Sequence, residues 1–150
     1  MKKIVLAIEF DEELDDIINF TVDLLQDRES EVFVVHAYES DLAVVDYAAP
    51  YLVDTIEMHE ERLQEQSKAV KEIVHALGEK GVRAHGFMKP INKNVPNSIL
   101  EFAEEKEAEL IIVGTHHPNR VERLVLGSVA EKTIRKSSIP VMVVPRKTKS

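Results

Sequence analysis

The chain of 150 residues contains no cysteine, no tryptophan and only 5% aromatic residues. The absence of cysteine excludes disulfides, thiolate zinc sites and a cysteine nucleophile, and it agrees with a reducing cytosol. The scarcity of aromatic rings leaves few platforms on which nucleic-acid bases could stack. The net charge of −8 argues in the same direction, because nucleic-acid binding depends on neutralising phosphates. We therefore expect no nucleic-acid partner.

Long hydrophobic runs are also missing. No apolar stretch approaches the roughly 18 residues that a membrane-spanning helix requires, and Met1-Lys2-Lys3 leads into a short apolar strand without the pattern of a signal peptide. We expect a cytoplasmic protein with no membrane partner. A chain of this length fits one domain, residues 1–150, and buries enough surface to fold without a disulfide or metal.

What the sequence does contain is an alternation of strand and helix patterns. Four unbroken apolar runs, at residues 4–8, 32–35, 110–113 and 141–144, are typical of strands buried on both faces. In a fifth segment, 82–88, apolar and polar residues come closer to alternating, which suits an edge strand. Helical periodicity covers residues 11–26, 52–77 (ended by Gly78 and Gly81) and 97–106. This order predicts a doubly wound α/β domain with a five-stranded parallel sheet. Residues 88–96, with two prolines, are expected to form an irregular loop.

The segment from Gly114 to Ser128 carries the strongest functional signal. It leaves an apolar strand at Gly114 and returns as Gly127-Ser128 at the head of a new helix. Ser128 and Glu131 have the spacing of a capping box, and a helix start with small residues exposes amides that suit an anion. Ligands of parallel sheets bind at the carboxyl ends of strands, where Glu9 also falls. The alternative is an ordinary, well-capped joint between strand and helix.

With these features, the chain resembles the universal stress protein family. The most specific matches are LGSVAEK at 126–132 and IPV at 139–141. The nucleotide-binding members of the family have the motif G-x2-G-x9-G-[ST], and here Gly114, Gly127 and Ser128 match it while His117 replaces the second glycine. If position 117 requires a positive φ, that replacement costs about 1–2 kcal/mol, which weakens a micromolar site without abolishing it.

The resemblance implies a Rossmann-like sheet of order 3-2-1-4-5 that binds ATP, with Mg²⁺, or AMP at its carboxyl edge. Glu9 would accept a hydrogen bond from a ribose hydroxyl, or else cap the helix near Asp11, and Ala37 and Val113 would flank the adenine. The full set of binding residues is expected to be Ala7, Ile8, Glu9, Ala37, Val113, Gly114, His116, His117, Gly127, Ser128 and Val129.

Other chemistries find little support. A metal site at His116-His117 lacks a third ligand, and His36 and His85 are expected at strand ends or on the surface. The sequence has no P-loop and no G-x-S-x-G elbow. Arg120 and Arg123 could meet phosphates or pair with nearby glutamates. No set of residues forms a catalytic constellation, so we expect no enzyme beyond slow ATP hydrolysis.

The last strand raises the question of oligomeric state. Val141-Met142-Val143-Val144 is apolar throughout, and an uncovered apolar edge invites pairing with another chain. A homodimer through this strand is one solution, and cover by the preceding helix is the other. The first functional hypothesis is an adenine-nucleotide-binding regulatory homodimer. The second is a stress-response dimer without nucleotide that acts through protein partners, with residues 40–50 as a contact surface.

Overall fold

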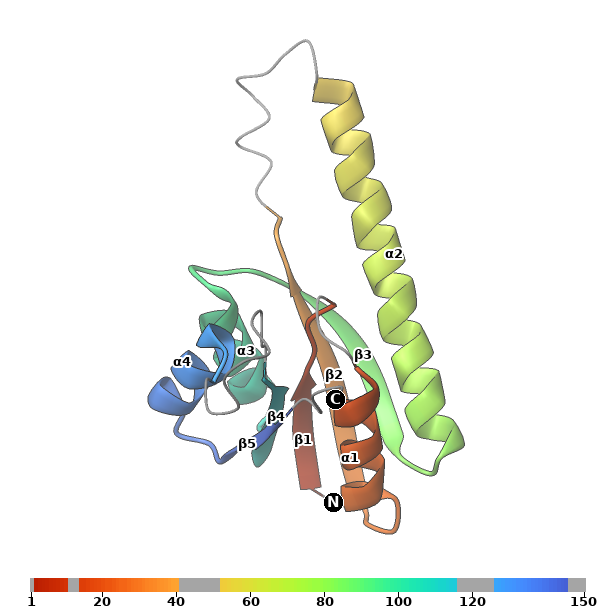
Figure 1. The fold of residues 1–150 in the computed structure, drawn as a ribbon, viewed down its shortest axis with the longest axis vertical. Coiled ribbons are helices and arrows are strands. Elements are labelled where there is room, and N and C mark those ends of the chain that lie inside the picture. The colour runs from red at the N-terminus through yellow and green to blue at the C-terminus, as the bar shows by residue number, and fades with distance from the viewer. Residues whose placement is uncertain (1, 11–13, 41–51, 116–125, 146–150) are drawn as a thin grey trace, which may run out of the picture.

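The computed structural model describes residues 2–10, 14–40, 52–115 and 126–145 (Figure 1). Within these ranges, five parallel strands alternate with four helices, and the strand order is β3-β2-β1-β4-β5. This confirms the predicted fold class and order. The elements are β1 (Lys2–Ala7), α1 (Asp15–Leu25), β2 (Ser30–Tyr38), α2 (Leu52–Glu79), β3 (Arg83–Pro90), α3 (Val95–Glu105), β4 (Leu110–Gly114), α4 (Ser128–Lys136) and β5 (Val141–Val144).

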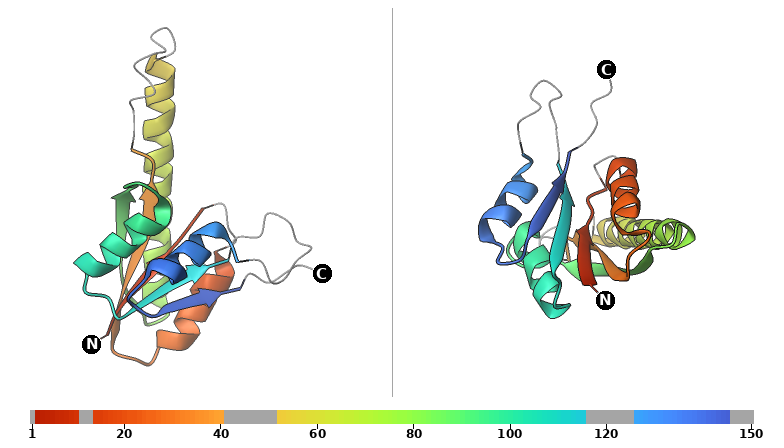
Figure 2. Two further views of the ribbon diagram at one scale, coloured as in Figure 1. Left: turned by 90° about the vertical axis from the view of Figure 1, so that its left-hand side faces the viewer. Right: turned by 90° about the horizontal axis from the view of Figure 1, so that it is seen from below.

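The helices form two layers, α1 and α2 on one face of the sheet and α3 and α4 on the other (Figures 1 and 2). Each face has its own hydrophobic core. In β1, Ile4 and Leu6 belong to the core under α1 and α2, whereas Val5 and Ala7 belong to the core under α3 and α4. Because successive strand residues point to opposite faces, a strand covered on both sides must be apolar at every position. That requirement explains the unbroken apolar runs.

The stretch predicted as an irregular loop at residues 88–96 is mostly regular, so that prediction is wrong at both ends. β3 continues to Pro90, and α3 begins at Val95. Proline is tolerated at the end of an edge strand and in the first turn of a helix, where no hydrogen bond of its nitrogen is lost. The Asn94 side chain caps α3 by accepting from the Asn97 amide at 2.8 Å. Only residues 91–94 connect the two elements.

α2 is the longest element, with 28 residues, and its N-terminal half extends beyond the sheet (Figures 1 and 2). Its C-terminal half packs on the sheet through Val70, Ile73 and Leu77. The helix runs through Gly78 to Glu79, so Gly78 does not end it as predicted. Gly81 does end the turn that follows: its φ of +85° is left-handed, and the next amide returns to the Leu77 carbonyl at 3.0 Å.

Candidate functional site

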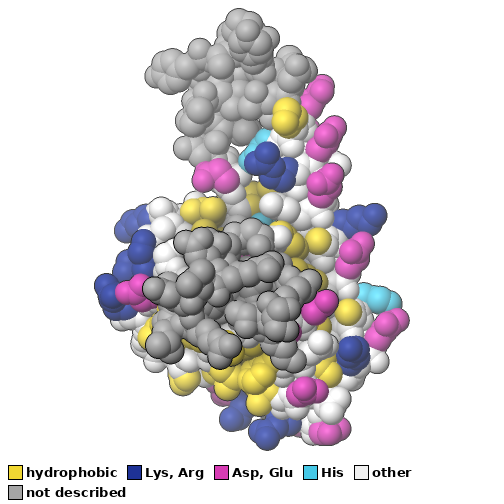
Figure 3. All heavy atoms as spheres, viewed as in Figure 1, with side chains coloured by type: hydrophobic (Ala, Val, Ile, Leu, Met, Phe, Trp, Pro, Cys, Tyr) yellow, Lys and Arg dark blue, Asp and Glu magenta, His cyan; other side chains and the backbone are white. Residues whose placement is uncertain are grey.

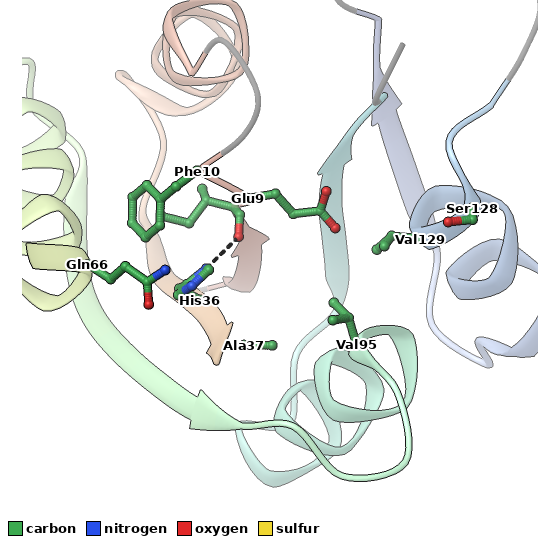
Figure 4. A pocket seen from close by; sticks show the side chains of 9 residues that line it. Glu9, Phe10, His36, Ala37, Gln66, Val95, Ser128 and Val129 are labelled. Atoms are coloured by element: carbon green, nitrogen blue, oxygen red, sulfur yellow. Dashed lines mark hydrogen bonds between the residues drawn. The ribbon is translucent and has the colours of Figure 1, made fainter. Parts of the chain in front are cut away.

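A pocket of about 440 Å³ opens at the carboxyl ends of β1 and β2 (Figure 4). α2 borders it on one side, and the N-terminal turns of α3 and α4 border it on the other. The volume falls in the range of small-molecule sites, about 300–1,000 Å³. The described residues that line the pocket are Ile8, Glu9, Phe10, His36, Ala37, Gln66, Val95, Ser128 and Val129.

The start of α4 forms one end of the pocket. Gly127 is the N-cap, with φ −61° and ψ 155°, and Ser128 is already the first helical residue. The predicted capping box is therefore wrong: the amide of Glu131 returns to the Gly127 carbonyl at 3.0 Å, and the Glu131 carboxylate pairs with Arg135. The first amides of a helix have no partner within it, so this turn presents positive ends of peptide dipoles beside the pocket.

Glu9 lies directly after β1 and its carboxylate extends across the pocket toward Val129 (Figure 4). Two roles were open for this residue, ribose contact or capping of the next helix. The N-cap of α1 is Leu14, five residues further on, so Glu9 does not occupy the cap position. Glu9 is half-buried and lines the pocket, and its contact with a ribose stays a prediction.

The structure brings together five of the eleven predicted binding residues, namely Ile8, Glu9, Ala37, Ser128 and Val129. Four others are described but are not among the residues that line the pocket: Ala7 and Val113 are buried in the core under α3 and α4, Gly114 ends β4, and Gly127 is the N-cap of α4. His116 and His117 lie outside the described residues, as do Arg120 and Arg123. The effect of His117 stays a prediction.

Four lining residues were not predicted as binding residues: Phe10, His36, Gln66 and Val95. His36 lies near the carboxyl end of β2, but it is not on the surface: its side chain is buried and its Nδ1 lies 3.2 Å from the Ile8 carbonyl oxygen. The Phe10 ring packs on it, with 4.5 Å between centroids. His85, by contrast, is exposed on β3 as expected and pairs with Glu31. The available signal for His36 was its position directly after the apolar run 32–35, at the end of a strand.

The described residues also bear on a metal site and on a membrane-spanning helix. Within the described ranges, no three histidine, aspartate or glutamate side chains gather closely enough to hold a metal ion. The described helices also include none with the length and apolar character needed to cross a bilayer.

The fold and the pocket together define a doubly wound α/β domain with a ligand-sized cavity at the carboxyl edge of its sheet. Residues 1–145 match the universal stress protein family. Universal stress protein MJ0531 of Methanocaldococcus jannaschii is 31% identical over 150 residues, which cover 99% of this chain and 84% of the relative. The chain belongs to the universal stress protein family.

Solved structures of relatives share the fold. MJ0577 of Methanocaldococcus jannaschii superposes with a TM-score of 0.74 at 24% identity, covering 99% of this chain and 98% of that one. The universal stress protein from Archaeoglobus fulgidus in complex with dAMP superposes with a TM-score of 0.69 at 21% identity, covering 96% and 98% of the two chains.

Proposed function

We propose that this protein is a cytoplasmic regulatory module that binds an adenine nucleotide, ATP or AMP, and works as a homodimer. The observation that carries the proposal is the pocket, which joins the carboxyl ends of β1 and β2 to the first turn of α4. The dAMP complex of the Archaeoglobus fulgidus relative supports an adenylate as the ligand. We expect no turnover beyond slow hydrolysis of ATP.

The two ends of the pocket suit the two ends of a nucleotide. The amides of Ser128 and Val129 would bind phosphate oxygens, since the N-terminus of a helix favours anions. Glu9 would accept from a ribose hydroxyl, and Ala37 would lie beside the base. When ATP is bound, Mg²⁺ would accompany the phosphates and offset part of their charge.

Isothermal titration calorimetry of Ser128→Asp and Ser128→Ala tests this site. Ser128 is exposed in the first turn of α4, where an aspartate stabilises the helix by roughly 0.3–1 kcal/mol. The same carboxylate would repel a bound phosphate, so we expect AMP and MgATP affinities to fall by about tenfold or more. Ser128→Ala keeps the backbone amides and should change affinity little.

The outcome separates this proposal from its alternatives. Equal affinities in the wild-type protein and Ser128→Asp would show that phosphates do not bind at α4. Phosphate release on incubation with ATP would instead favour an enzyme of nucleotide chemistry.

The second candidate, a dimer that acts through protein partners without nucleotide, is favoured by the surface of α2. The part of this helix beyond the sheet exposes Glu57, Glu60, Glu61 and Glu65, and Met58 is 61% exposed among them. Figure 3 shows acidic side chains along this edge of the molecule. A partner with basic and apolar groups would fit such a surface. The other predicted contact surface, residues 40–50, lies almost wholly outside the described residues. The absence of heat with every adenylate would favour this candidate.

A further inference from the structure

Gln66 is the only described residue of α2 that lines the nucleotide-sized pocket. It falls on the face of α2 that packs on the sheet, in a series with Leu63, Val70, Ile73 and Leu77, which are all apolar. A glutamine at such a position carries a cost, because a partly buried amide must find hydrogen-bond partners. The amide interrupts the apolar stripe at the level of the pocket.

The surroundings of Gln66 are fixed by contacts that do not use its amide. The Ile8 carbonyl can only accept, so His36 donates from Nδ1 at 3.2 Å and its ring orientation is set. Phe10 packs against that ring with an interplanar angle of 55°. Figure 4 shows the Gln66 side chain extending from α2 toward His36. Among the described residues, none forms a hydrogen bond with the Gln66 amide, which leaves a donor and an acceptor for a ligand.

We infer that Gln66 determines base specificity, with its amide hydrogen-bonded to the amino edge of adenine. This inference rests on the proposed function. A primary amide offers one acceptor and one donor side by side, which matches the 6-amino group of adenine and an adjacent ring nitrogen. Gln66 and the first turn of α4 lie at opposite ends of the pocket (Figure 4). A nucleotide with phosphates at Ser128 therefore directs its base toward α2.

A cycle of two proteins and two ligands tests the contact. The ligands are AMP and purine riboside 5′-monophosphate, which lacks only the 6-amino group, and the proteins are the wild type and Gln66→Leu. One hydrogen bond corresponds to about 5- to 10-fold in affinity. We expect the wild type to prefer AMP by that factor. Gln66→Leu should bind the two ligands about equally. Its affinity for AMP should fall by more than that factor, because the substitution removes both hydrogen bonds of the amide, to the 6-amino group and to the ring nitrogen.

Gln64→Leu is the matched control, because Gln64 is exposed on the same helix two residues away. It should keep both the affinity for AMP and the preference over the purine riboside, and circular dichroism should show all three proteins folded. If Gln66→Leu retains the wild-type preference, or weakens both ligands by the same factor, Gln66 does not read the base. If the wild type itself gives no heat with AMP, the proposed function fails and this inference fails with it.

Discussion

The two edge strands of the sheet, β3 and β5, differ in how far they are protected from pairing with another chain. Amide and carbonyl groups of successive strand residues point alternately to the two sides of the strand. The Ile91 amide donates to the Tyr38 carbonyl of β2, so the backbone amides and carbonyls of the odd-numbered residues of β3 point toward β2. The backbone groups of the even-numbered residues point away from the sheet; these residues are Ala84, Gly86, Met88 and Pro90. At β5, the carbonyl of Pro140 accepts from the Ile111 amide and that of Val144 accepts from the Thr115 amide. The backbone groups of Val141 and Val143 therefore point away from β4, toward the open edge.

The edge at β3 is polar and closely covered by neighbouring elements. The Lys89 ammonium lies 2.8 Å from the Glu105 carboxylate, His85 pairs with Glu31, and Pro90 offers no amide to a further strand. α2 packs directly on the strand at Gly86. The edge at β5 has four residues, Val-Met-Val-Val, and none is charged. The comparison indicates that β3 is protected from pairing, whereas β5 is left able to pair.

The largest effect is expected where α2 covers β3. A Cβ atom at Gly86 would lie 2.7 Å from Cγ1 of Val70, and Val70 is buried and β-branched, so it cannot rotate away. Gly86→Ala should therefore lower the free energy of unfolding by about 1–3 kcal/mol in urea denaturation.

Two variants control this prediction. Gly78 has no atom near its added Cβ, and Gly78→Ala should stabilise α2 by about 0.5–1 kcal/mol. The double variant Gly86→Ala/Val70→Ala removes the clashing methyl, so its loss should be smaller than the sum of the two single losses. Additive losses would show that α2 does not press on the β3 edge.

The sequence predicted the sheet well because burial on both faces leaves a local signal. β5 was predicted to the residue, since its four apolar positions stand between Pro140 and Pro145. β2 was predicted too short at both ends, because neither Ser30-Glu31 nor His36-Ala37-Tyr38 continues the apolar run. His36 is buried, and its Nδ1 donates to the Ile8 carbonyl, 28 residues away. No pattern in the neighbouring sequence reports such a partner.

The pocket was predicted in part for a similar reason. Glu9, Ala37 and Ser128 follow strand ends or begin a helix, and the carboxyl edge of a parallel sheet collects such positions. Gln66 and Val95 enter the pocket because of how α2 and α3 pack on the sheet. That arrangement depends on long-range contacts. Gln66 falls within the helical pattern predicted for residues 52–77, but its place opposite His36 required the structure.

An intermediate effect is expected at the open edge, β5, if two copies of the chain pair there. Val143→Pro removes an outward-facing amide without touching the hydrogen bonds to β4. In a symmetric pair each protomer would lose one bond, which corresponds to about 1–3 kcal/mol in total and to about 5- to 150-fold in the dimer dissociation constant. Sedimentation equilibrium measures that constant directly.

Ala84→Pro is the matched control, because it removes an outward-facing amide from the other edge. It should leave the dissociation constant unchanged. If Ala84→Pro separates the protomers and Val143→Pro does not, the interface lies at β3. A wild-type protein that sediments as a monomer at all concentrations would contradict the homodimer itself.

The smallest effect is expected from the charges on the β3 edge. The side chain of Lys89 is 19% exposed and that of Glu105 is 57% exposed, so water screens much of their attraction. Lys89→Met keeps the apolar stem and should lower the free energy of unfolding by less than about 1 kcal/mol. That difference should shrink further in 1 M salt, where the Debye length is about 3 Å. Lys80→Met, at an exposed lysine without an ion pair among the described residues, should change stability less at any salt concentration. Because the ion pair adds so little stability, we infer that the lysine matters mainly for protection: a charged side chain on an edge strand opposes pairing with another strand. A loss of more than 2 kcal/mol for Lys89→Met would instead make the pair a structural contact, and the contrast with β5 would then concern stability rather than protection.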